Sequence, residues 1–103
     1  MSDFVRAVAA SQVKPGDLLT VEVEGESVLI ANIDGKYYAM GAICTHEEWD
    51  LSEGSRNGFL ITCAGHGAVW DVRTGKAEFD DPLEDEPLFE VKEEDGQLYL
   101  RKR

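Results

Sequence analysis

The sequence predicts a small all-β domain, an antiparallel sandwich or barrel, over residues 1–103. Three observations predict this fold class. Apolar and polar residues alternate in short runs, as they do in strands with one buried face. Turn signals, such as Asp-Gly pairs, separate these runs at close spacing. No stretch of ten residues keeps a helical period, so we expect helices to contribute single turns at most.

The first predicted elements form a three-stranded meander. The segment DLLTVEV at 17–23 alternates apolar and polar side chains, which indicates a half-buried strand. A Glu-Gly pair at 24–25 then turns the chain into a second strand at about 27–33. An Asp-Gly pair at 34–35, which is a strong hairpin signal, turns it into a third strand at 37–40.

The second half of the chain is expected to contain shorter elements. Residues 51–54 are expected to make one helical turn, and residues 59–62 and 68–71 are expected to be strands. The acidic stretch DDPLEDEP at 80–87 contains two prolines, so we expect an ordered surface loop there. Apolar residues on both sides of an Asp-Gly pair at 95–96 predict a last hairpin.

The composition indicates one soluble, acidic domain. A chain of 103 residues has no length for a second, catalytic domain. Its formal charge of −11 disfavours nucleic acid and anionic membranes as partners, and it favours a protein with a basic docking patch. The N-terminus, MSDFVRAVAA, lacks a cationic region followed by a long apolar stretch, and no segment is apolar for long enough to cross a membrane. We therefore expect a cytoplasmic protein.

Both cysteines and both histidines of the chain occur in two short segments. The first is Cys44-Thr45-His46, and the second is Cys63-Ala64-Gly65-His66. Glycines flank His66 on both sides, as they would where the backbone approaches a bulky inorganic centre or needs positive φ. Each segment is predicted to be the tip of a hairpin-like loop. Two such loops that face each other could supply two thiolates and two imidazoles to one site.

Four interpretations of these ligands compete. Buried cysteines with incidental histidines leave the regular spacing unexplained. A disulfide between Cys44 and Cys63 leaves both histidines unexplained and would be exceptional in a reducing cytoplasm. A structural zinc site has the right ligand types, but zinc modules usually pair Cys with Cys and His with His. A [2Fe-2S] cluster of the Rieske type uses this mixed set, because two cysteines bind one iron and two histidines bind the other.

The motif resembles that of the Rieske-type ferredoxins. The pattern C-x-H is followed by C-x-x-H-G, by Trp-Asp at 70–71 and by Thr-Gly at 74–75, and the resemblance extends over nearly the whole chain. It implies that Cys44 and Cys63 bind the inner iron of a [2Fe-2S] cluster, while His46 and His66 bind the outer iron near the surface. It also implies a Rieske-type fold, in which stacked antiparallel sheets carry a cluster-binding subdomain formed by two loops.

The function that this resemblance implies is electron transfer. The chain is similar to the soluble ferredoxin components of aromatic-ring dioxygenase systems, so the implied donor is a flavin-dependent or iron-sulfur reductase and the implied acceptor is a terminal oxygenase. Such a carrier is expected to be a monomer when free, and it is not expected to be an enzyme itself. Two alternatives stay open. One is a small Rieske-like subunit of a reductase such as nitrite reductase, and the other is a structural zinc-binding interaction module.

The residues after the second ligand pair bear on the reduction potential. High-potential relatives have hydroxyl donors two and four residues after the last histidine, whereas this chain has Ala68 and Trp70. We therefore expect a midpoint in the lower part of the Rieske span, roughly −150 to 0 mV. Trp70, on an alternating strand, is expected to pack in the core and to support the second loop.

Overall fold

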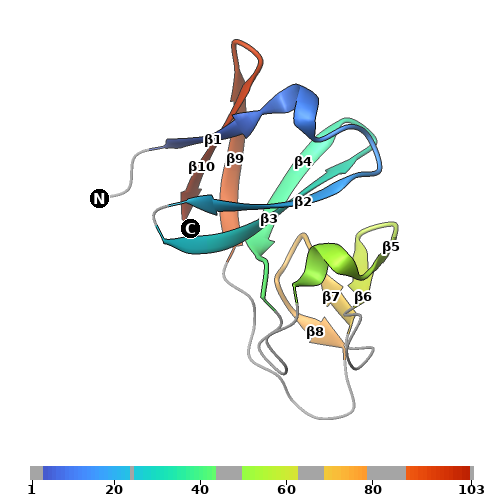
Figure 1. The fold of residues 1–103 in the computed structure, drawn as a ribbon. Helices are drawn as coiled ribbons and strands as arrows, with labels where there is room; N and C mark the ends of the chain where they lie inside the picture. Colours follow the sequence, from blue (N-terminus) through green and yellow to red (C-terminus); the bar gives the residue numbers. More distant parts are fainter. Residues whose placement is uncertain (1–3, 24, 44–49, 63–68, 79–87, 103) are drawn as a thin grey trace.

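The computed structural model describes residues 4–23, 25–43, 50–62, 69–78 and 88–102. These residues form ten strands in two antiparallel sheets, together with two short 3-10 helices. The all-β prediction is therefore confirmed. Figure 1 shows the larger sheet curled into a nearly closed barrel, with the smaller sheet packed against one end of it. Within the part of the chain that the structure describes, no helix is long and apolar enough to span a membrane.

The larger sheet has six strands in the order β1-β10-β9-β4-β3-β2. Its two edge strands, β1 and β2, contact each other, so the sheet closes on itself and leaves little free edge. The strands are β1 (Val5–Ala9), β2 (Leu18–Val23), β3 (Glu26–Ile33), β4 (Lys36–Gly41), β9 (Leu88–Glu94) and β10 (Gln97–Lys102).

The predicted meander and the predicted C-terminal hairpin are both confirmed. Strands β2, β3 and β4 pair antiparallel in sequence order, and β9 pairs with β10. The turn between β3 and β4 has φ +54° at Asp34 and +88° at Gly35, and the turn between β9 and β10 has φ +52° at Asp95 and +77° at Gly96. Positive φ at both central residues matches the right-handed twist of the paired strands, which is why Asp-Gly is a reliable hairpin signal.

The smaller sheet has four short strands in the order β5-β6-β7-β8. The strands predicted at 59–62 and 68–71 correspond to β6 (Leu60–Thr62) and β7 (Val69–Asp71). The predicted helical turn corresponds to the 3-10 helix η2 (Leu51–Glu53). Strands β5 (Ser55–Asn57) and β8 (Ala77–Glu78) have no counterpart in the sequence analysis, because β5 is polar throughout and β8 has only two residues, so neither shows alternation.

The N-terminal elements also have no counterpart in the sequence analysis. Strand β1 pairs with β10, with Val5 opposite Leu100, and the 3-10 helix η1 (Ala10–Gln12) follows it. The two strands lie at opposite ends of the chain, so their pairing is a long-range contact with no local signal. The acidic loop predicted at 80–87 lies outside the described residues.

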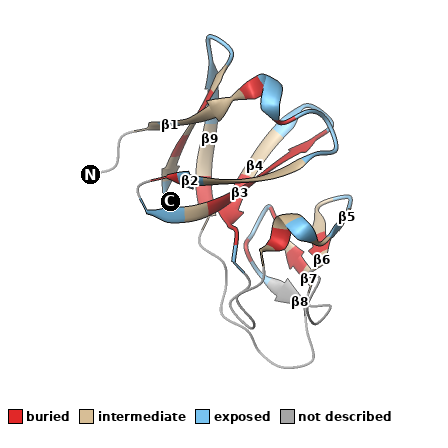
Figure 2. Ribbon diagram, viewed as in Figure 1, coloured by how far each residue is buried: buried red, intermediate tan, exposed pale blue. Residues whose placement is uncertain are grey.

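The β3–β4 hairpin lies between two hydrophobic clusters. Figure 2 colours much of β3 as buried. Along β3, Val28 and Ile30 face the barrel interior, while Leu29, Ala31 and Ile33 face the smaller sheet. Both faces of the strand are therefore buried, which explains its nearly continuous apolar sequence. We call the second group the site-side cluster. Its buried members are Leu29, Ala31, Ile33, Met40, Ala42, Leu51, Ile61, Trp70 and Val72.

Candidate metal centre

The four predicted ligands lie outside the described residues. Cys44 and His46 belong to the segment 44–49, and Cys63 and His66 belong to the segment 63–68. The structure does describe the residues on both sides of each segment. Among the described residues, no group of three or more His, Cys, Asp and Glu side chains is arranged to hold a metal ion. The ligand set therefore stays a prediction, and the flanking residues carry the structural argument.

The first segment begins and ends at paired residues. Ile43 and Asp50 form an isolated antiparallel bridge, which we call the first neck. Next to it, the Leu51 amide donates a hydrogen bond of 2.7 Å to the Ala42 carbonyl. Ala42 and Leu51 are both fully buried in the site-side cluster. The chain that enters segment 44–49 and the chain that leaves it are thus held together on a packed base.

Asp50 fastens the first neck to two other elements. Its Oδ1 accepts hydrogen bonds from the Thr20 hydroxyl of β2 at 2.7 Å, from the Ser52 amide at 2.9 Å and from the Ser52 hydroxyl at 2.7 Å. Partial burial by itself would raise the pKa of Asp50, but these hydrogen bonds outweigh it and hold the pKa below its ordinary value. The carboxylate therefore stays ionised, and it ties the neck to the barrel and to η2.

Sequence reasoning missed this role of Asp50, although a local signal for half of it exists. An Asp followed two residues later by Ser, at the start of a predicted helical turn, is a typical capping pattern. The partner on β2, Thr20, lies 30 residues earlier in the chain and has no such signal.

The second segment also begins and ends at paired residues. Strands β6 and β7 pair antiparallel, with Thr62 opposite Val69 and Ile61 opposite Trp70. We call the Thr62–Val69 pair the second neck. Ile61 and Trp70 are fully buried in the site-side cluster, together with Ala42 and Leu51 of the first neck. Both necks therefore rest on the same hydrophobic base, and segments 44–49 and 63–68 depart from it.

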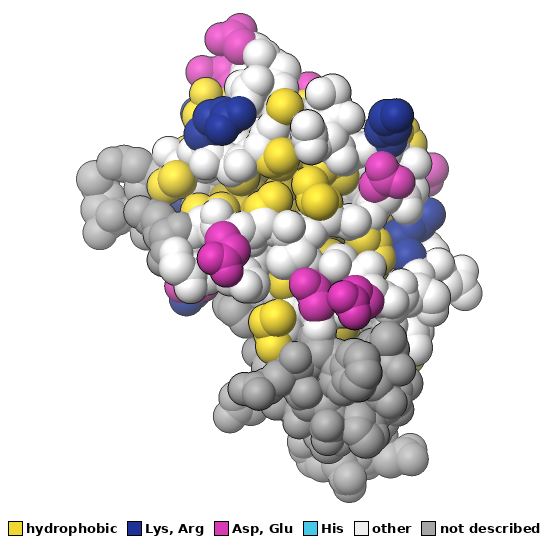
Figure 3. All heavy atoms as spheres, in the orientation of Figure 1, with side chains coloured by type: hydrophobic (Ala, Val, Ile, Leu, Met, Phe, Trp, Pro, Cys, Tyr) yellow, Lys and Arg dark blue, Asp and Glu magenta, His cyan; other side chains and the backbone are white. Residues whose placement is uncertain are grey.

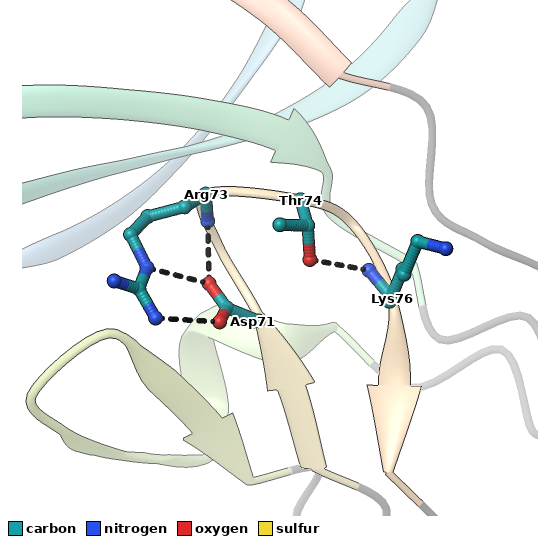
Figure 4. Close-up of polar contacts among 4 residues, drawn as sticks. All are labelled: Asp71, Arg73, Thr74 and Lys76. Atoms are coloured by element: carbon teal, nitrogen blue, oxygen red, sulfur yellow. Dashed lines mark hydrogen bonds and ion pairs between the residues drawn. The ribbon is translucent and has the colours of Figure 1, made fainter.

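The turn after β7 is held by a local ion pair (Figure 4). The Arg73 guanidinium donates to both carboxylate oxygens of Asp71, at 3.1 and 2.9 Å, and the Arg73 amide donates to Oδ1 at 2.8 Å. The hydrogen bond from the Arg73 side chain lowers the pKa of Asp71. Arg73 also lies over the ring of Phe59, 4.2 Å from its centroid. These contacts hold the C-terminal end of β7, whereas the second neck lies at its N-terminal end.

Trp70 contributes a buried polar atom to the base of the site. The side chain has no exposed surface, which confirms its predicted place in the core. Its indole Nε1 has no hydrogen-bond partner among the residues that the structure describes. The buried amide of Asn32 is different, because it donates to the Val13 carbonyl at 2.8 Å and accepts from the Gly35 amide at 3.0 Å.

The residues fit an iron-sulfur cluster better than the other three interpretations. Two thiolates and two neutral imidazoles are the ligand set of a Rieske-type [2Fe-2S] centre. The two mixed Cys/His pairs each belong to one of the two segments that leave the common base. The buried indole N–H of Trp70, which has no acceptor among the described residues, belongs to this base. It suits a centre whose sulfur atoms accept hydrogen bonds.

Comparison with known proteins supports the same centre. A family model described as the Rieske [2Fe-2S] domain matches residues 3–94. The biphenyl dioxygenase ferredoxin subunit of Pseudomonas sp. strain KKS102 is 36% identical over 90 residues, which cover 86% of this chain and 83% of that protein.

Two solved structures have the same fold over nearly the whole chain. The ferredoxin of carbazole 1,9a-dioxygenase from Nocardioides aromaticivorans IC177 matches with a TM-score of 0.87 and 25% identity, covering 94% of this chain and 95% of that one. A chain in a complex of reduced oxygenase and oxidized ferredoxin of carbazole 1,9a-dioxygenase matches with a TM-score of 0.84 and 30% identity, covering 94% and 91%. With the match to the family model, these findings show that the chain belongs to the Rieske [2Fe-2S] domain family.

Proposed function

We propose that this protein is a one-electron carrier, which accepts an electron from a flavin-dependent or iron-sulfur reductase and delivers it to the terminal oxygenase of an aromatic-ring dioxygenase system. One observation carries the proposal. Two paired necks on one buried base flank the two Cys/His segments in a Rieske-family chain. The named relatives are ferredoxin components of such systems, and one similar structure is a complex with an oxygenase.

The proposed ligands divide between the two irons. Cys44 and Cys63 bind one iron, and His46 and His66 bind the other through neutral imidazoles. The bound cluster supplies reversible one-electron chemistry. The protein's own contribution would be to hold each segment at its two paired ends, which rest on one buried base.

The surface near the first neck supports docking next to the metal centre. Ile43 directly precedes Cys44, and it is the one large hydrophobic side chain among the described residues that is exposed, at 38%. On the face that Figure 3 draws, acidic and basic side chains are scattered over the described surface. The net charge of −11 favours a partner with a basic docking face. We place the carrier in the cytoplasm, as a monomer when free.

The test is to purify the protein anaerobically and to measure iron, acid-labile sulfide, the visible spectrum and the EPR signal of the reduced form. We expect two irons and two sulfides per chain. His46→Ala and His66→Ala should each abolish the cluster or change the EPR signal. Glu53→Gln, which replaces an exposed carboxylate beside the first neck, is the matched control and should leave the signal unchanged.

The results also separate the alternatives. A colourless protein that contains zinc would contradict the proposal, and so would a normal EPR signal after both histidines have been replaced. Tight co-purification with a large catalytic chain would favour the reductase-subunit alternative over a free carrier.

A further inference from the structure

The indole N–H of Trp70 needs an acceptor that the described residues do not provide. The side chain is fully buried, and its Nε1 has no hydrogen-bond partner among the described residues. Folded proteins rarely leave a buried donor unpaired, because the donor has lost its hydrogen bonds to water. Each such case calls for a physical explanation.

The neighbours of Trp70 explain why no nearby side chain pairs with it. The other buried members of the site-side cluster are aliphatic side chains and the thioether of Met40, which is a weak acceptor. Tyr38 packs against this cluster and carries a hydroxyl, but Nε1 makes no hydrogen bond to it. The backbone of Trp70 is paired on both sides, with Ile61 opposite it in β6 and Ala77 opposite it in β8. The acceptor must therefore come from outside the site-side cluster.

The position of Trp70 points to the metal centre. It is the second residue of β7, and Val69 of the second neck immediately precedes it. The site-side cluster also contains Ala42 and Leu51, whose backbones are hydrogen-bonded to each other beside the first neck. Trp70 thus belongs to the base from which both ligand-bearing segments depart. Of the groups expected on this base, the sulfur atoms of a [2Fe-2S] cluster are acceptors that gain negative charge when an electron arrives.

We propose that Trp70 donates a hydrogen bond from Nε1–H to a sulfur atom of the cluster, and that this bond raises the cluster's reduction potential. The proposal rests on the proposed function, because it requires the cluster. The added electron makes a formally neutral centre anionic, so a donor to sulfur stabilises the reduced form more than the oxidised form. An indole N–H is a hydrogen-bond donor, as a hydroxyl is.

The test compares the holoprotein with Trp70→Phe, which keeps an aromatic ring and removes the N–H. We expect the midpoint potential of Trp70→Phe to fall by up to about 59 mV, a roughly tenfold smaller equilibrium constant for reduction by one electron. The control is Leu98→Val, which trims a side chain buried in the barrel interior and removes no polar group. Its midpoint should match that of the wild type, so an equal fall in both variants would overturn the proposal.

A spectroscopic test of the wild type does not depend on how well Trp70→Phe folds. Pulsed EPR of the reduced protein, labelled with ¹⁵N-tryptophan, should show one indole nitrogen and one exchangeable proton coupled to the cluster. The chain has two tryptophans, so the coupling must persist in Trp49→Phe and vanish in Trp70→Phe. Absence of the coupling from the wild type, or its loss in Trp49→Phe alone, would overturn the proposal. Purified protein without iron and labile sulfide would instead show that the proposed function has failed.

Discussion

Asp50 is the residue on which the geometry of the first neck most depends. Three hydrogen bonds converge on its Oδ1, from Thr20 and from two atoms of Ser52. They connect three parts of the chain: β2 of the barrel, the bridge to Ile43, and η2. A residue that caps a helix and also bonds to another element contributes to local order and to tertiary packing at the same time.

Replacing Asp50 should therefore destabilise the protein measurably. We expect Asp50→Ala to lower the free energy of unfolding by about 1–2 kcal/mol, because it removes the cap and leaves the Thr20 hydroxyl without its acceptor. Asp50→Asn keeps one acceptor oxygen, so its loss should be smaller. Denaturant unfolding monitored by circular dichroism measures both. Glu53→Gln is the control and should change the free energy by less than about 0.5 kcal/mol.

The same residue should make stability depend on pH in the acid range. The folded-state pKa of Asp50 lies below its ordinary value of 3.8, so the contribution of its carboxylate is complete above the ordinary value. It is lost as the pH falls through the ordinary value towards the lower, folded-state pKa. The stability difference between the wild type and Asp50→Asn should therefore shrink below about pH 4. A difference that stays constant from pH 7 to pH 3 would contradict this assignment.

At the scale of elements, the β3–β4 hairpin links the barrel to the metal centre. Its strands line the barrel interior with one face and the site-side cluster with the other. The turn that joins them, Asp34-Gly35, has positive φ at both residues. The conformation of these two turn residues thus fixes the pairing register of β3 and β4, and one face of this hairpin packs under both necks.

Gly35→Ala should weaken this hairpin. At φ +88° a Cβ is strained even though nothing lies within 4 Å of its position, so we expect a loss of about 1–2 kcal/mol in unfolding free energy. Gly35→Asn should cost less, because Asn tolerates positive φ better. Thermal unfolding measures the series. Lys36→Ala, an exposed change at the next residue, is the control, and a loss as large as that of Gly35→Ala would contradict the argument.

At the scale of the whole molecule, the two sheets differ in how they are held. The strands of the barrel are five to eight residues long, whereas those of the smaller sheet are two or three residues long. So short a sheet has few backbone hydrogen bonds of its own and depends on packing against the β3–β4 hairpin. A cluster bound by the proposed ligands would add to its stability. The cluster is therefore expected to stabilise one part of the molecule more than the other.

Removing the cluster should loosen the smaller sheet selectively. We expect amide hydrogen exchange to accelerate strongly at Ile61 and Trp70 in the apoprotein, because the proposed ligation would stabilise the sheet that holds both residues. Leu98 and Leu100, buried in the barrel, serve as the internal control and should retain most of their protection. Equal acceleration in both sheets would show instead that the fold unfolds as one unit without its cofactor.

Much of the fold was predictable because its signals are local. The Asp-Gly turns and the alternating strands of the meander depend on a few neighbouring residues, and the structure has them as predicted. The four-residue ligand set was also predictable, as a pattern of spacing, and it stays a prediction. Strand β5 was not predicted because it has no apolar residue, and β8 was not predicted because it has only two residues. Strand β1 was not predicted because its partner is at the far end of the chain.

The sequence by itself determined the turns, the strand pattern and the pairing of one Cys with one His in each segment, since each depends on spacing along the chain. Only the tertiary structure decided that both faces of β3 are buried, that Thr20 bonds to Asp50, and that Trp70 carries an unpaired buried N–H among the described residues. Those features arise from contacts between residues distant in sequence. Burial and hydrogen-bond satisfaction are properties of the packed molecule, so no local pattern records them.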